Sequence, residues 1–401
     1  MNPKSPERLG MRPIDLILFL CGNRGAIERV AATRMAWLIG AILVLTAGIA
    51  RNYDHLDLLR QSEWFIGPFA ASMVSIIFIY LWISGPLKLR QVGPFWRQAG
   101  TFLVLAWMTA PCAWLYAIPV ESMTDIVTAT KWNIAFLAIV AFWRVAIIVR
   151  AVSVLTEVSW LRALPLVLAP AALEAMLGSR FQALSLIGIM GGIRLPPETQ
   201  LLVDAANLTA SVSFWLLIAL FFLTLMAKGV AKRPLSRPTS PASPALFAVT
   251  AVLMLIWTVI AVPQHPRIAN RYELQRLIDA RDYQAAAAFA SAKSRTDFPP
   301  HYDIPPQMYP WLPNELLDEL SMDAPTWLRE EWINRAIASH KEMNTLFQER
   351  WQKTIVRYPE IPEAIDRHAA ELRSRSKSLS EDEARWLSNY DQQNNPPAPS
   401  P

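Results

Sequence analysis

Residues 133–155 read NIAFLAIVAFWRVAIIVRAVSVL, and this stretch decides the fold class of the chain. Its only charged side chains are Arg144 and Arg150, and the rest is almost continuously apolar. A lipid bilayer has a hydrocarbon core of about 30 Å, which an α-helix of about 20 apolar residues crosses. Residues 133–155 therefore predict a membrane-spanning helix.

Further segments of the chain pass the same test of length and hydropathy. Five are clear, at residues 35–50, 65–87, 101–119, 210–227 and 245–263. A weaker one, at residues 163–177, is short and contains Pro165, Pro170 and Glu174. The pattern predicts an all-α fold: a polytopic membrane helix bundle of six or seven spans, followed by a C-terminal soluble helical domain.

The charge of the chain changes sign after Pro263. The 401 residues carry a net charge of +5, but residues 1–263 hold 21 Lys and Arg against 12 Asp and Glu, whereas residues 264–401 hold 17 against 21. A basic apolar part is thus joined to an acidic polar part. This distribution indicates no basic face for nucleic acid, so we expect the lipid bilayer and a protein as partners, and no nucleic acid.

The basic residues of the loops also indicate an orientation. Counted from the N-terminus, alternate loops hold 15 Lys and Arg on one side and 5 on the other. Cytoplasmic loops of membrane proteins carry the excess of Lys and Arg. We therefore expect seven spans, a cytoplasmic N-terminus and an extracytoplasmic C-terminal domain. A re-entrant segment at residues 163–177 would instead place that domain in the cytoplasm.

Two segments outside the spans predict an interfacial helix and an extended linker. Residues 14–21 are too short to cross a bilayer and contain Asp15, so they predict a helix that lies in the membrane interface. Residues 233–244 are rich in Pro and Ser and predict an extended linker that lets the last span sit apart from the others. The expected domains are a cytoplasmic segment (1–34), a transmembrane domain (35–263), a soluble helical domain (264–391) and a disordered tail (392–401).

Ionisable side chains inside the spans are the first candidates for a functional site, because a charge in lipid is costly. Arg144 lies near the middle of its span, and Glu174 lies in the weak span that follows. A short turn between two antiparallel helices would bring them within ion-pair distance. The pair then serves either helix packing or a polar path for a substrate or a proton.

Motifs of catalysis and metal binding are absent from the sequence. The chain has no Gly-x-Ser-x-Gly or His-Glu-x-x-His pattern, and its 2 Cys and 5 His are dispersed. Asp54, His55 and Asp57 stand close together, either as metal ligands or with Asp54 as a helix cap. We expect no catalytic residue, no metal site and no cofactor, and the lack of a catalytic motif favours a protein that is not an enzyme.

The C-terminal domain reads as helices joined by a proline-rich strap. Residues 271–293 are similar to one tetratricopeptide-type helical hairpin, and residues 325–358 carry an apolar stripe at helical spacing. The strap, residues 297–313, has six prolines that exclude helix and central strand. Its aromatic side chains either staple the strap to the helices or bind a partner, and the candidates are Phe298, Tyr302, Tyr309 and Trp311.

The chain contains RMAW at residues 34–37, AGIARNYD at residues 47–54 and DFPPH at residues 297–301. These short patches resemble an uncharacterised family of bacterial multi-pass membrane proteins. The resemblance implies a bacterial cytoplasmic (inner) membrane location and no particular activity. The leading hypothesis is a membrane-anchored assembly or interaction protein whose C-terminal domain binds a partner. The alternative is a transporter or channel-like component that uses Arg144 and Glu174.

Overall fold

A computed structural model describes residues 10–50, 63–187, 197–226, 231–236, 240–262, 265–299, 324–330 and 360–374, with residues 384, 387, 388, 390 and 391. Regular structure in these residues is helical, apart from an isolated bridge between Thr33 and Ser240. The predicted all-α fold class is confirmed. The chain divides into two compact units, Met1–Gly188 with Glu198–His265, and Ile189–Pro197 with Pro266–Pro401.

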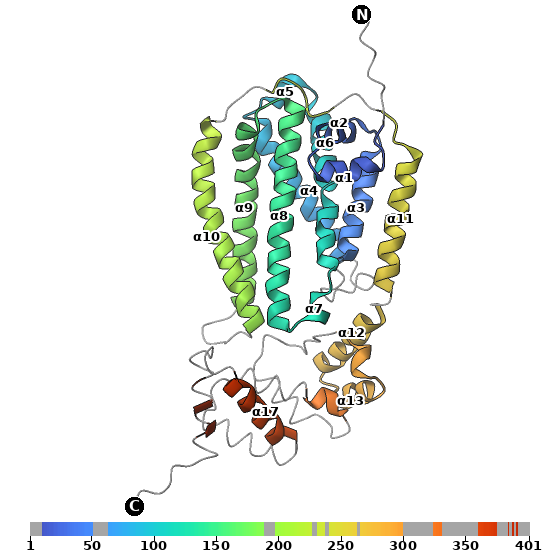
Figure 1. Ribbon diagram of the computed structural model, residues 1–401, viewed down its shortest axis with the longest axis vertical. Coiled ribbons are helices and arrows are strands. Elements are labelled where there is room, and N and C mark those ends of the chain that lie inside the picture. The colour runs from blue at the N-terminus through green and yellow to red at the C-terminus, as the bar shows by residue number, and fades with distance from the viewer. Residues whose placement is uncertain are drawn as a thin grey trace, which may run out of the picture. The chain divides into compact units, whose positions relative to one another are not determined.

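The first unit is a helix bundle. Figure 1 shows its long helices side by side along the vertical axis, with the short helices α1, α2 and α5 at the upper end. The elements are α1 (Ile14–Leu20), α2 (Arg24–Ala32), α3 (Ala36–Ala50), α4 (Glu63–Ser84), α5 (Leu89–Val92), α6 (Phe95–Trp107), the 3-10 helix η2 (Ala110–Ala117), α7 (Val120–Met123), α8 (Ile126–Thr156), α9 (Trp160–Ile187), α10 (Pro197–Met226) and α11 (Pro244–Ala261).

Four helical segments of the described chain are long and apolar enough to cross a membrane: Phe95–Ala117, Val127–Thr156, Trp160–Phe181 and Gln200–Thr224. Pro244–Ile260 passes the same test only when it is taken together with His265–Ile278. Ala36–Ala50 and Phe69–Ser84 are apolar but shorter than the test requires. The predicted transmembrane character is confirmed at this level. The four segments include the proline-containing one that the sequence marked as weak.

The segment predicted at residues 101–119 is not one uniform α-helix. α6 ends at Trp107, and the chain continues as the tighter helix η2. Pro111 has no N–H group, so it cannot continue the α-helical hydrogen-bond ladder, and Cys112 N bonds Thr109 O over 3.0 Å instead. The proline therefore places a break in the helix inside the apolar segment.

α9 is longer and more regular than its sequence suggested. It runs through Pro165 and Pro170 without ending. Each proline removes one backbone hydrogen bond, but away from water the remaining backbone groups have no better partners than those within the helix. The two prolines therefore do not shorten the helix, and Glu174 lies well inside it.

The linker before α11 is attached to the bundle, which corrects the expectation that it separates the last span from the others. Ala231 N bonds Leu87 O over 3.0 Å, and Lys232 N bonds Thr156 O over 3.0 Å. Ser240 forms the bridge with Thr33, and Leu246 of α11 belongs to the same hydrophobic core as α3. These contacts hold α11 against the bundle.

We call the end of the bundle that carries α1, α2 and α5 the loop end. It is formed by residues 10–35, 85–94, 157–159, 231–236 and 240–243. α8 holds the turn between α1 and α2 there, because Trp143 Nε1 donates to Leu20 O over 2.9 Å and Arg150 Nε donates to Gly22 O over 3.3 Å. Gly22 has a φ of 70°, which glycine adopts without strain. The expected interfacial helix is thus one arm of a docked helical hairpin.

The second unit contains α12 (His265–Asp279), α13 (Tyr283–Ser291), the 3-10 helix η4 (Arg295–Asp297) and α17 (Glu360–Ser374). Asp282 caps α13 by accepting from Ala285 N over 3.1 Å. The apolar stripe that the sequence placed at residues 325–358 lies mostly outside the described residues. α17 lies within residues 264–391, where the sequence predicts a helical domain.

Candidate functional site

Arg144 reaches from α8 to the break between α6 and η2. Its Nε donates to Thr109 Oγ1 over 2.9 Å, and Thr109 Oγ1 donates to Ala106 O over 2.6 Å. The carbonyl oxygens at the C-terminal end of a helix carry partial negative charge. The guanidinium therefore fastens α8 to the end of α6, at a place where the helix dipole favours a cation.

Glu174 reaches from α9 to a different helix. Ser75 Oγ of α4 donates to Glu174 Oε2 over 2.6 Å, and the carboxyl is half-buried. No Lys or Arg of the described chain lies within ion-pair distance of it. The suggested ion pair with Arg144 is thus not formed among these residues, because α8 directs Arg144 to Thr109 and α9 directs Glu174 to Ser75.

Two tryptophans make contacts of the same kind, which sequence reasoning missed. Trp107 Nε1 of α6 donates to Ser72 Oγ of α4 over 3.3 Å. Trp114 Nε1 of η2 donates to Thr46 Oγ1 of α3 over 3.0 Å. Both tryptophans lie inside an apolar segment rather than at its end, and this position was the sequence signal that could have identified them. We call the whole set the interhelical polar pairs: Thr46–Trp114, Ser72–Trp107, Ser75–Glu174 and Thr109–Arg144.

A buried amide organises the loop end. Gln98, in the first turn of α6, is fully buried. Its Nε2 donates to Leu89 O over 2.8 Å and to Gly93 O over 3.0 Å, while its Oε1 accepts from Leu235 N of the linker over 3.1 Å. One side chain therefore joins α6, the loop before it and the linker to α11.

A buried ion pair holds the α1–α2 hairpin. Asp15 is fully buried and accepts from Arg29 Nε over 2.8 Å, from Arg29 Nη2, and from Arg12 N over 2.8 Å. Burial by itself raises the pKa of Asp15, but the hydrogen bonds from Arg29 and Arg12 and the charge of Arg29 outweigh it, so the pKa is lowered from 3.8. Asp15, which the sequence marked only as costly in lipid, is therefore a structural carboxylate.

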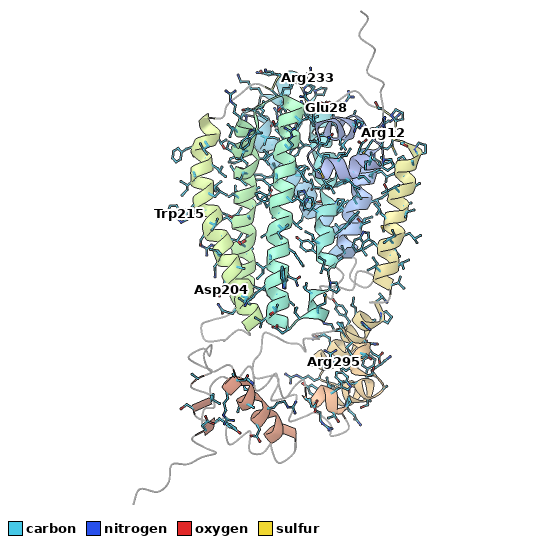
Figure 2. All side chains as sticks on the ribbon, in the orientation of Figure 1. Arg12, Glu28, Asp204, Trp215, Arg233 and Arg295 are labelled. Atoms are coloured by element: carbon cyan, nitrogen blue, oxygen red, sulfur yellow. The ribbon has the colours of Figure 1, made fainter. Side chains whose placement is uncertain are left out.

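The basic residues that the sequence assigned to one side of the membrane lie at the loop end or in the adjoining parts of α6, α8 and α9. Figure 2 shows Arg12, Glu28 and Arg233 at this end of the bundle and Asp204 near the other. Arg233 pairs with Glu157 over 3.1 Å, and Arg24 pairs with Glu28 over 3.1 Å. The described members of the set are Arg12, Arg24, Arg29, Arg34, Lys88, Arg90, Arg97, Arg150, Arg162, Lys232 and Arg233.

In the second unit, one of the candidate partner-binding aromatics has a packing role. Phe298 is 2% exposed and packs against Trp327, with ring centroids 5.1 Å apart and the rings tilted by 45°. Its ring therefore presents no surface to a partner and acts as a staple. Tyr302, Tyr309 and Trp311 lie outside the described residues.

Within the part of the chain that the structure describes, no group of His, Cys, Asp and Glu is arranged to hold a metal ion. Asp54, His55 and Asp57 are not among the residues searched. No model of a protein family, no curated protein and no solved structure matches the chain. The family resemblance drawn from the short patches thus remains an expectation, and the function has to be argued from the geometry alone.

Proposed function

We propose that this chain is a membrane-anchored assembly protein, in which the helix bundle is a platform and residues 264–391 bind a protein partner. One observation carries the proposal: the polar side chains inside the bundle join helices to one another, as the interhelical polar pairs do. In membranes such a hydrogen bond contributes about 0.6–2 kcal/mol to helix association. A platform needs this kind of fixed packing.

The proposed topology has seven spans in the bacterial inner membrane, with a cytoplasmic N-terminus and an extracytoplasmic C-terminal domain. The clustering of basic residues at the loop end supports this orientation. The count of seven spans is supported by seven helical segments that run alternately away from the loop end and back towards it. These are α3, α4, α6 with η2, α8, α9, α10 and α11. A reporter that is active only outside the cytoplasm, fused after Pro401, is expected to be active; an inactive reporter, with a cytoplasmic one active in its place, reverses the orientation.

The partner contact is tested by cross-linking in the full chain. A photoreactive amino acid at Tyr302 or Trp311 is expected to yield one adduct of defined mass. The control carries the same group at Gly48 in α3, where no other atom lies within 4 Å of an added Cβ. An adduct pattern at both strap positions that is identical to that at Gly48 contradicts a specific partner site.

A transporter or channel-like component is the second candidate, and the helix break beside Arg144 favours it. Discontinuous helices at membrane depth form the substrate sites of many transporters. The two functions differ in what Thr109→Val and Arg144→Met do to stability. A packing role predicts that both lower the Tm of the solubilised protein and that the double variant is no worse than either. Unchanged Tm values for all three variants favour the transport path.

A further inference from the structure

Glu174 lies at membrane depth in α9. The apolar segment Trp160–Phe181 places it 14 residues after Trp160 and 7 before Phe181. At about 1.5 Å per residue, these separations are about 21 Å and about 10 Å. Exposed Arg162 and Arg180 lie inside the segment near its two ends, as expected for side chains that reach the two membrane surfaces. The carboxyl is therefore within the hydrocarbon core of the proposed topology.

The surroundings of the carboxyl provide one neutral partner. Ser75 Oγ donates to it, and Ser75 lies more than two turns from either end of α4. Leu177 and Gly178, one turn further along α9, are exposed on the outside of the bundle. Glu174 is itself half-buried, so it lies at the edge of a face that meets lipid.

The titratable groups named below, on the helices around α9, bond to other residues or are exposed. Tyr80 of α4 donates to Phe95 O, Arg144 of α8 bonds Thr109, and Arg150 of α8 bonds Gly22 O. Lys131 is exposed in the second turn of α8, and Asp204 of α10 is exposed and accepts from Gln200 Nε2 over 2.8 Å. Within the described chain, none of these groups forms an ion pair with Glu174.

An ionised carboxylate without a cation is unfavourable in lipid, and such a group neutralises by taking up a proton. One hydroxyl hydrogen bond does not replace the hydration shell of a carboxylate. We propose that Glu174 is a proton-binding carboxyl of the membrane interior, which carries its proton at neutral pH and reacts with apolar carbodiimides. The inference rests on the membrane position of α9 in the proposed topology, and it adds a site that a platform by itself does not require.

The reaction follows from the protonation state. The carboxyl proton moves to one nitrogen of N,N′-dicyclohexylcarbodiimide, and the carboxyl oxygen bonds to its central carbon. The resulting O-acylisourea rearranges to a stable N-acylurea. Nothing leaves, so the α9 peptide gains the mass of the whole reagent. The reagent is apolar and enters the bilayer, whereas a water-soluble carbodiimide does not.

The experiment labels the full chain in native membranes with each carbodiimide between about pH 5 and about pH 7, and reads the rate at Glu174 by peptide mass spectrometry. A carboxyl with an ordinary titration near pH 4 loses about 100-fold in protonated fraction over this range. We expect the rate at Glu174 with the apolar reagent to change by less than about twofold. Glu174→Gln is expected to remove the label, and Asp204 on α10 serves as an exposed carboxyl of the same chain.

Two results overturn the inference, and they differ in what else they overturn. In the first, the rate at which the apolar reagent labels Glu174 falls about 100-fold between about pH 5 and about pH 7, and the water-soluble reagent does not label it. Glu174 is then ionised, and α9 remains in the membrane. If the water-soluble reagent labels Glu174 as fast as Asp204, α9 lies in water and the proposed topology fails as well. Absence of label from both reagents, with the unmodified α9 peptide detected, also contradicts the inference.

Discussion

Replacing Arg29 by Met is the sharpest test of how the loop end is held together. The variant keeps an unbranched side chain but removes the guanidinium that donates to Asp15 through two nitrogens. The fully buried carboxylate then retains one donor, Arg12 N. The α1–α2 hairpin is expected to open far more often, because a buried charge without its partner is more stable in water.

The magnitude follows from burial. Breaking a buried ion pair by removing one partner costs about 3–5 kcal/mol. The Arg29 side chain is 32% exposed, and water that reaches it weakens the pair, so we expect about 3 kcal/mol, the low end of this range. At about 1.4 kcal/mol per factor of ten, the open state becomes about 100-fold more populated.

Trypsin cleavage after Arg24 measures this opening in the detergent-solubilised chain. Arg24 is in the first turn of α2, and cleavage requires local unfolding, so its rate follows the open population. Glu28→Gln is the matched control, since it breaks the exposed Arg24–Glu28 pair, which contributes less than about 1 kcal/mol. The double variant Asp15→Asn/Arg29→Met is expected to recover most of the loss. Cleavage of Arg29→Met no faster than that of Glu28→Gln would refute the reasoning.

The pH dependence has a definite sign. The pKa of Asp15 is lowered in the folded chain, so its contribution to stability is present above the ordinary value of 3.8 and is lost as the pH falls through the lower folded value. In Arg29→Met the carboxyl takes up its proton at a higher pH. The difference between variant and wild type, read by hydrogen exchange of the α2 amides, is therefore expected to shrink below pH 3.8; a difference that grows on acidification contradicts the assignment.

The remaining predictions concern side chains that hold the loop end and α3. Gly10→Ala is expected to lower the Tm, because an added Cβ would lie 1.9 Å from Pro241 O, whereas Gly48→Ala in α3 meets nothing within 4 Å and is expected to raise it, with about 1 kcal/mol of added helix stability. Gln98→Leu leaves buried backbone groups unpaired and is expected to cost about 3 kcal/mol in thermal unfolding, against less than about 0.5 kcal/mol for exposed Gln91→Leu. Equal changes in stability for Gly10→Ala and Gly48→Ala would contradict the close contact at Gly10. Equal changes for Gln98→Leu and Gln91→Leu would contradict the hydrogen bonds of Gln98.

The sequence predicted the helical fold class because a membrane-spanning chain satisfies its backbone hydrogen bonds within each helix. Hydropathy located most of the apolar helices without knowledge of their neighbours. It was least accurate where proline occurs. Pro111 ends α6, whereas Pro165 and Pro170 lie inside α9. The difference depends on what the surrounding backbone and side chains do, which no local pattern contains.

The candidate site was predicted in part. Arg144 and Glu174 were identified because charge is rare at membrane depth, but their partners, Thr109 and Ser75, are neutral and common there. A hydroxyl in an apolar helix has no distinctive pattern, since it also bonds to its own backbone, as Ser72 Oγ does to Phe69 O over 2.8 Å.

The sequence alone determined that this chain has apolar helices, basic loops on one side and an acidic C-terminal part, because hydropathy and charge are properties of each segment. The tertiary structure decided which helices touch. It turned the linker into an attachment, through Leu235 and Ser240, and the lone Asp15 into a buried ion pair. It also decided that Glu174 bonds to Ser75 rather than to Arg144. The physical reason is that a hydrogen bond between helices depends on their relative rotation and depth, which are set by the packing of the whole bundle.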